Sequence, residues 1–173
     1  TTADDYLAQA GASRGKKGRE KTVIRLAEQS LKLRPTKLGY GYSGFAKIRL
    51  GNYQGAIDDF TKIIEIDSHD AIAYNSRGIA KKDLGDYQGA IADATKAIAI
   101  NPKDPIAYEL RGVIKYYLKD YQGMCLDVKK ASSLGSKTVT RGVNQFCSSL
   151  KTGSVVLSTQ AAHAQSADDY LDA

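Results

Sequence analysis

The chain has 173 residues, of which 42% are hydrophobic and 25% are charged, as in a globular protein with one ordinary core. No run approaches 18 consecutive apolar residues, so the sequence predicts no membrane span, and any targeting leader is absent or removed. The net charge of +6 is compatible with simple solubility, or with nucleic acid, an anionic membrane surface or an acidic partner. Two isolated histidines and two cysteines without zinc spacing exclude a metal site of the usual kinds, and we expect no cofactor.

Residues 4–36 form the first predicted unit, a helix pair around a basic loop. Residues 11–19 read Gly-Ala-Ser-Arg-Gly-Lys-Lys-Gly-Arg. The spacing is wrong for a phosphate loop, no strand precedes it, and no Ser or Thr follows the lysine. We interpret this loop as a solvated turn. The alternative is a patch for an acidic partner, membrane headgroups or RNA, and the absence of interleaved aromatic residues weakens the RNA case.

Three gapless repeats of 34 residues follow, at residues 37–70, 71–104 and 105–138. In the second repeat, a helical apolar pattern from Ile72 to Leu84 ends at Gly85, and Asp86 can cap a second helix from Tyr87 to Ile100. We therefore predict two antiparallel helices in each repeat. The matched positions include Tyr40, Tyr74 and Tyr108; Gly44, Gly78 and Gly112; Asp59, Asp93 and Asp127; and Lys62, Lys96 and Lys130.

The run Gly-Asp-Tyr-Gln-Gly-Ala-Ile at residues 85–91, followed by Lys-Ala-Ile at 96–98 and Asn101-Pro102, resembles the tetratricopeptide repeat. The resemblance is specific over residues 37–138 and weaker over residues 4–36, which we interpret as a diverged first repeat. It implies an all-α fold, a right-handed superhelical solenoid of antiparallel helix pairs. The apolar pattern of residues 139–151 predicts a C-terminal capping helix, and residues 152–173 form a tail.

Charged residues occupy packing positions that the family usually keeps apolar or aromatic. We predict that Arg77 pairs with Asp93 and that Arg111 pairs with Asp127, because a charge on a packing face requires a partner. The alternative is that these guanidinium groups extend into solvent. No such pair is expected in the first clear repeat, which has Ser43 at this position. The small residues Gly78, Gly89 and Ala90 are expected to let the two helices of the second repeat approach closely.

Cys125 and Cys147 are expected at the same level of two helices that turn back near residues 135–136. Two interpretations remain open: two small buried hydrophobic side chains, or a disulfide, which would need an oxidising compartment. The compartment is not determined by the sequence, and both a cytoplasmic and an exported protein fit. Neither cysteine is expected to act as a nucleophile, because no histidine lies near it in the repeat geometry.

The family resemblance implies that the first helix of each repeat lines a concave groove that binds a peptide or protein partner. The lysine, arginine and asparagine residues by which some family members clamp chaperone tails have no counterpart at the matching positions of the three clear repeats. The expected groove residues are Phe45, Ile48, Arg49, Asn75, Ile79, Lys82, Glu109, Val113, Tyr116 and Tyr117.

The leading functional hypothesis is a protein-interaction scaffold or assembly factor. The alternative is a binder of nucleic acid or an anionic surface through the basic N-terminal loop. We expect no enzyme and no small-molecule substrate, because nucleophile–base pairs, phosphate loops and metal clusters are missing from the pattern. Residues 167–171 repeat residues 3–7, Ala-Asp-Asp-Tyr-Leu, so self-association through the tail is a further hypothesis.

Overall fold

The computed structural model describes residues 1–137 and 141–151, and all regular secondary structure within them is helical. The chain forms two compact units, Thr1–Ile100 and Asn101–Ala173. The first unit holds six helices and the described part of the second holds three. Their bounds are α1 (Ala3–Ser13), α2 (Glu20–Leu33), α3 (Lys37–Arg49), α4 (Tyr53–Ile66), α5 (Ala71–Leu84), α6 (Tyr87–Ile100), α7 (Pro105–Tyr117), α8 (Tyr121–Ser133) and α9 (Arg141–Lys151).

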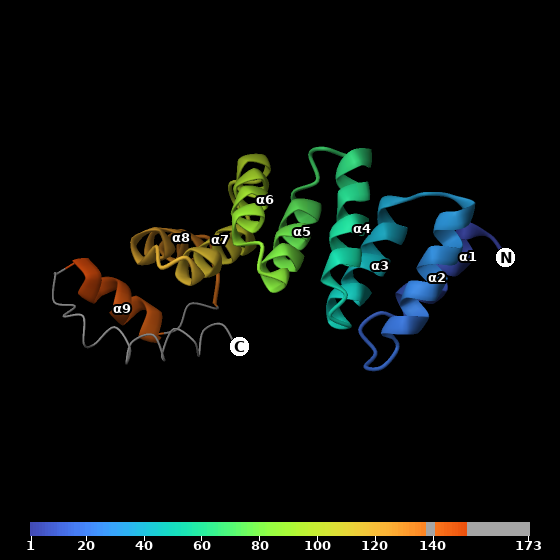
Figure 1. Cartoon of the computed structure of the whole chain (residues 1–173), viewed down its shortest axis with the longest axis horizontal. Coiled ribbons are helices and arrows are strands. Elements are labelled where there is room, and N and C mark those ends of the chain that lie inside the picture. Colours follow the sequence, from blue (N-terminus) through green and yellow to red (C-terminus); the bar gives the residue numbers. More distant parts are fainter. Residues whose placement is uncertain (138–140, 152–173) are drawn as a thin grey trace. The chain divides into compact units, whose positions relative to one another are not determined.

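In the first unit, each helix packs against its neighbours in the chain, as Figure 1 shows for α1 to α6. Helix α3 also contacts α1 and α5, so the first helices of the three pairs form one layer. The expected all-α fold of stacked antiparallel helix pairs is confirmed. The solenoid arises because one pair cannot cover its own apolar face and needs the next pair to bury it.

Helices α6 and α8, the second helices of their pairs, start at side-chain caps in matched positions. The carboxylate of Asp86 accepts a hydrogen bond from the Gly89 backbone N–H at 2.9 Å, which confirms the predicted cap. Asp120 and Gly123 repeat this contact at 2.9 Å. The preceding helix α5 ends at Gly85, whose φ of 90° lies in the left-handed region that glycine tolerates best.

A glycine stands three residues after each of these capping aspartates, and the structure explains it differently from the close helix approach that the sequence suggested. A Cβ atom on Gly89 would lie 2.1 Å from Asp86 Oδ2, so glycine makes room for the capping side chain and not for the facing helix. A close approach of two helices is found at Gly44 of α3, the position that matches Gly78 in the repeat pattern. A Cβ atom there would lie 2.9 Å from Phe60 Cζ of α4.

Two clusters of small and large apolar side chains form part of the core of the first unit. One joins α1, α2 and α3, and the other joins α3, α4 and α5. Phe60 is 1% exposed and lies at the centre of the second cluster. The buried members of the two clusters are Ala10, Val23, Leu26 and Ala46, and Ala56, Phe60, Ile63, Ala73 and Ala80.

An ion-pair triad joins the two helices of the pair α5–α6. Asp93 is 4% exposed and accepts hydrogen bonds from Arg77 Nε at 2.8 Å and Nη2 at 2.7 Å. Lys81 Nζ reaches the same carboxylate at 2.8 Å. These hydrogen bonds to Asp93 raise the pKa of Arg77 above its ordinary value. The predicted Arg77–Asp93 pair is confirmed, and Lys81 is the partner that the sequence reading did not assign.

The second unit repeats this triad in the pair α7–α8. Arg111 donates to Asp127 from Nε at 2.9 Å and from Nη2 at 2.6 Å, and Lys115 Nζ lies 2.8 Å from the same carboxylate. The predicted Arg111–Asp127 pair is therefore confirmed as well.

Helix α9 packs against α8 in the second unit through Val143 and Phe146, which join Met124 and Val128 in one buried cluster. This helix is the expected capping helix, and it begins at Arg141. The start of the predicted cap at residue 139 and the predicted tail at residues 152–173 lie outside the described residues. The division of the chain into repeats of 34 residues at the stated bounds remains a prediction.

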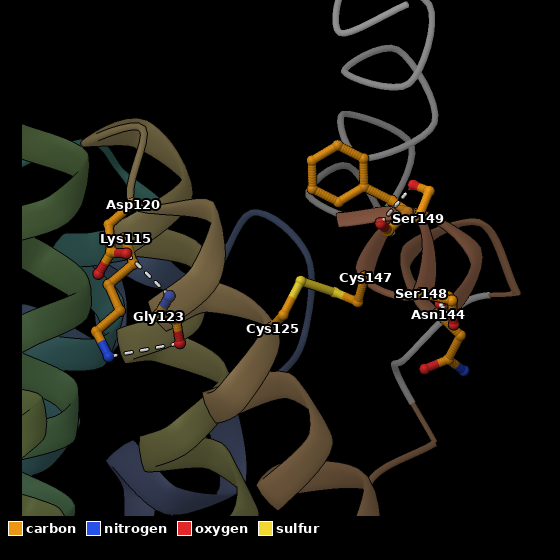
Figure 2. Close-up of a disulfide and its surroundings, with 9 residues drawn as sticks. Lys115, Asp120, Gly123, Cys125, Asn144, Cys147, Ser148 and Ser149 are labelled. Carbon is orange, nitrogen blue, oxygen red and sulfur yellow. Dashed lines mark hydrogen bonds between the residues drawn. A yellow bond between two sulfur atoms is a disulfide. The ribbon is translucent and has the colours of Figure 1, made fainter. Parts of the chain in front are cut away.

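A disulfide joins Cys125 of α8 to Cys147 of α9, with a Cα–Cα distance of 5.5 Å (Figure 2). Both cysteines are half-buried beside the cluster of Met124 and Val128. The link closes a loop with a sequence separation of 22 residues and fastens α9 to α8.

Candidate functional site

A groove of about 320 Å³ runs along α3 in the first unit. Four α3 residues at positions i, i+3, i+4 and i+7 face it: Leu38, Gly41, Tyr42 and Phe45. Helix α5 contributes Ile72, Ala73 and Ser76, and α4 contributes Phe60 and Ile63. The layer of first helices therefore forms the sides of the groove, and the second helix α4 lies beneath them.

The groove leaves large apolar side chains in contact with solvent. Leu38 is 52% exposed, Phe45 39% and Ile72 69%. The ring of Phe45 is held edge-on against the buried ring of Phe60, with the centroids 5.2 Å apart. An exposed aromatic ring fixed by a buried one is a preformed apolar contact surface, because little side-chain entropy is lost when a ligand covers it.

Gly41 keeps the middle of the groove open. A Cβ atom at this position would meet nothing nearer than Ile63 Cδ1 at 4.0 Å, so packing does not require glycine here. Glycine inside a helix costs about 0.5–1 kcal/mol relative to alanine. What glycine provides at residue 41 is the space above Phe60 and Ile63.

One end of the groove carries a neutralised cation. Lys37 Nζ lies 2.7 Å from an Asp67 oxygen and 2.8 Å from an Asp70 oxygen. The hydrogen bond with Asp67, followed by that with Asp70, raises the pKa of Lys37, and the same contact with Lys37 lowers the pKa of Asp67. Asp70 also caps α5 by accepting from the Ala73 backbone N–H at 2.9 Å.

The other end of the groove carries Arg14, the C-cap residue that follows α1. Its guanidinium carbon lies 5.6 Å from the centre of the Tyr42 ring, a cation–π contact. Arg14, Tyr42 and Phe45 also line a smaller neighbouring depression of about 30 Å³, together with Lys16 and Arg49. Arg49 is paired with Glu20 at 2.6 Å.

Residues 14–19 of the basic loop are exposed, and the glycines among them, Gly15 and Gly18, have a φ of 79°. Four cations stand in this loop, namely Arg14, Lys16, Lys17 and Arg19. Within the described ranges none of them forms an ion pair with a carboxylate. The loop therefore presents unneutralised positive charge beside the Phe45 end of the groove.

The expected groove residues of the first unit lie in different environments. Phe45 lines the groove described above, whereas Ile48 packs against the core cluster around Phe60. Asn75 is buried, at 5% exposure, and Ile79 is half-buried. Lys82 is half-buried and paired with Asp83 at 2.6 Å. That these residues bind a partner remains a prediction.

The expected groove residues of the second unit also differ from one another. Val113 and Tyr116 pack against the cluster shared by α8 and α9. Tyr117 is 44% exposed, with its ring 5.9 Å from that of Tyr116. Glu109 accepts a hydrogen bond from the Ser136 hydroxyl.

The sequence reading missed Tyr42 and Arg14 as site residues. The stripe from Leu38 to Phe45 at helical spacing could have identified the α3 side of the groove, including Tyr42. No sequence pattern places Arg14, because its contact with Tyr42 is set by the packing of α1 on α3.

A second cavity of about 620 Å³ lies between α8 and α9. It is lined by the disulfide cysteines and by Leu126, which is 70% exposed, with Gln122, Lys129 and Asn144 among its polar residues.

Among the described residues, no group of His, Cys, Asp and Glu side chains could hold a metal ion. No helix within the same residues has the length and hydrophobicity needed to cross a membrane.

The comparisons with known proteins agree with this architecture. The model of the tetratricopeptide repeat family matches residues 71–104, the segment that contains α5 and α6. The comparison with curated proteins found no match.

Among solved structures, MamA residues 41 to the end from Desulfovibrio magneticus RS-1 is 18% identical and has a TM-score of 0.71. The match covers 76% of this chain and 75% of that one. Two further MamA structures are 22% and 24% identical, with TM-scores of 0.71 and 0.70. They cover 76% of this chain in both cases, and 77% and 72% of their own chains. At these identities the likeness establishes the fold.

Proposed function

We propose that this chain, a tetratricopeptide-repeat protein, is a protein-interaction scaffold that holds a segment of another protein in the groove along α3. The observation that carries the proposal is the open apolar surface of Leu38, Phe45 and Ile72 above a rigid floor. A surface of this kind suits a short extended or helical segment with apolar anchors.

The groove contains features that favour binding over simple packing. Phe45 is held in place by Phe60, and Gly41 leaves space that no neighbouring side chain occupies. A solenoid whose helix pairs pack on one another presents such a surface without rearrangement, so little free energy is spent on ordering it.

The proposal is tested with the variant Gly41→Leu, which adds a side chain to the groove at a position where the new Cβ atom meets nothing nearer than Ile63 Cδ1 at 4.0 Å. The matched control is Gln88→Leu, which adds the same side chain to an exposed position of α6 outside the groove. Both variants are expected to retain the helical circular dichroism of the parent chain.

Partners are then captured from cell extract with the parent chain and with each variant. We expect a protein that the parent and Gln88→Leu retain and that Gly41→Leu loses. Equal retention by all three would show that the groove is not the binding site.

The unneutralised basic loop supports a second candidate, the binding of nucleic acid or an anionic surface. This contact would weaken steeply with added salt and would not respond to Gly41→Leu. The same capture, repeated at low and high salt, therefore separates the two functions.

A further inference from the structure

We infer that the segment held by the groove is acidic at one end, with carboxylates facing Arg14 and Lys16 and apolar anchors on Leu38, Phe45 and Ile72. This inference rests on the proposed function and specifies the chemistry of the partner.

The first argument is the balance of charge around the groove. Four cations lie on the groove and the adjoining depression, and two of them are neutralised by the protein: Lys37 by Asp67 and Asp70, and Arg49 by Glu20. The other two, Arg14 and Lys16, have no carboxylate partner in the part of the chain that the structure describes. A bound carboxylate would supply the missing countercharge.

The second argument concerns the orientation of a bound peptide along the groove. Lys37 stands at the start of α3 and Phe45 lies eight residues later, which corresponds to about 12 Å along a helix. Arg14 lines the groove and also the depression beside Phe45, so the unneutralised charge is at the Phe45 end. At the Lys37 end, one ammonium group is shared by the two carboxylates of Asp67 and Asp70, so no cationic charge is left over there. A peptide therefore has one preferred orientation, with its acidic residues beyond the anchor that covers Phe45.

The third argument is the way in which Arg14 is held. Its guanidinium group lies against the Tyr42 ring, which is itself a wall of the groove. A guanidinium group on an aromatic face is partly ordered before binding, and its planar donors match a carboxylate better than a flexible ammonium does. Hydrogen bonds between charged groups are also stronger than neutral ones.

The test uses a defined synthetic probe, a fluorescein-labelled peptide with the sequence of residues 166–173, Ser-Ala-Asp-Asp-Tyr-Leu-Asp-Ala. It carries three carboxylate side chains beside a tyrosine and a leucine. The matched neutral peptide has asparagine in place of each aspartate. Binding of both peptides to the intact chain is measured by fluorescence anisotropy at low salt.

The protein variant is Arg14→Gln, and its control is Arg25→Gln. Arg25 is exposed on α2 and its side chain donates to Gln29 at 3.2 Å, so this control removes the same charge away from the groove. We expect Arg14→Gln to weaken binding of the acidic peptide by about threefold to tenfold. Arg25→Gln should leave it unchanged, and the neutral peptide should bind less tightly and ignore both variants.

Three results would overturn the inference: no binding of the acidic peptide, equal binding of the two peptides, or equal effects of Arg14→Gln and Arg25→Gln. The variant Gly41→Leu distinguishes a failure of the acidic-partner inference from a failure of the proposed function. Loss of both peptides in Gly41→Leu without any effect of charge would keep the groove and reject the acidic partner. Unchanged binding to Gly41→Leu would reject the groove itself.

Discussion

The pairs α3–α4 and α5–α6 share one repeat pattern but join their helices differently. In both pairs a buried aspartate accepts from a lysine of the first helix at 2.8 Å, Lys47 to Asp59 and Lys81 to Asp93. Only α5–α6 adds an arginine, Arg77, which grips the carboxylate with two nitrogens. The matching position of α3 is Ser43, which is fully buried.

The difference shows that one repeat pattern can fix two helices to each other or support a binding surface. Three charged groups fix α5 to α6, and the bidentate geometry determines their spacing. In α3–α4, Phe60 packs so close to Gly44 that an added Cβ atom would lie 2.9 Å from Phe60 Cζ. Phe60 in turn supports Phe45 on the groove side. The pair with the simpler ion pair is thus the one that supplies Leu38, Tyr42 and Phe45 of the groove, while α5 of the other pair supplies Ile72.

Among the variants that test this difference between α3–α4 and α5–α6, Asp93→Ala is expected to lower the free energy of unfolding most. It leaves Arg77 and Lys81, whose side chains are 17% and 19% exposed, without their shared counterion. Removal of one member of a buried ion pair costs about 3–5 kcal/mol, and we expect the lower end of that range. Asp59→Ala strands only Lys47 and should cost about 1–2 kcal/mol. Urea unfolding of both variants, followed by circular dichroism, measures the two losses, and equal losses would contradict the role of Arg77.

The disulfide of the second unit offers a covalent counterpart to these ionic contacts. Closure of a loop of 22 residues stabilises the folded chain by about 3 kcal/mol in the chain-entropy description. We expect reductant to lower the melting temperature of the parent chain and to make both thiols available to an alkylating reagent. The variant carrying Cys125→Ser and Cys147→Ser serves as the control and should not respond to reductant. A parent chain that melts identically with and without reductant would argue against the link.

The smallest expected effect on stability concerns two glycines at matched positions, Gly44 of α3 and Gly112 of α7. Gly44→Ala places a methyl group 2.9 Å from Phe60, which must shift, and we expect a loss of about 1–3 kcal/mol. Gly112→Ala places it 3.4 Å from Val128, an ordinary contact. That change should be neutral or stabilise the chain by up to about 1 kcal/mol, because alanine is the better helix former. Urea midpoints of the two variants report the contrast, which would be absent if Phe60 yielded freely.

The groove was less predictable than the fold. Phe45, Ile79 and Val113 occupy the same position in three repeats, and the sequence treats them alike. The structure leaves Phe45 39% exposed, half-buries Ile79 and packs Val113 against the cluster at α8 and α9. Leu38, Ile72 and Ile106 likewise occupy one position in three repeats, and they are 52%, 69% and 54% exposed.

The sequence by itself determined the helix pairs of the repeats, the cap at Asp86 and the arginine–aspartate pairs. These depend on contacts within one repeat, where the spacing in the chain fixes which side chains meet. Only the tertiary structure decided that Lys81 shares Asp93, that Arg14 reaches Tyr42, and that Gly41 opens a space above Ile63. A period of 34 residues identifies equivalent positions, but the neighbouring helix determines which of them is covered. Burial is a property of the packed assembly of helices and not of the repeat alone.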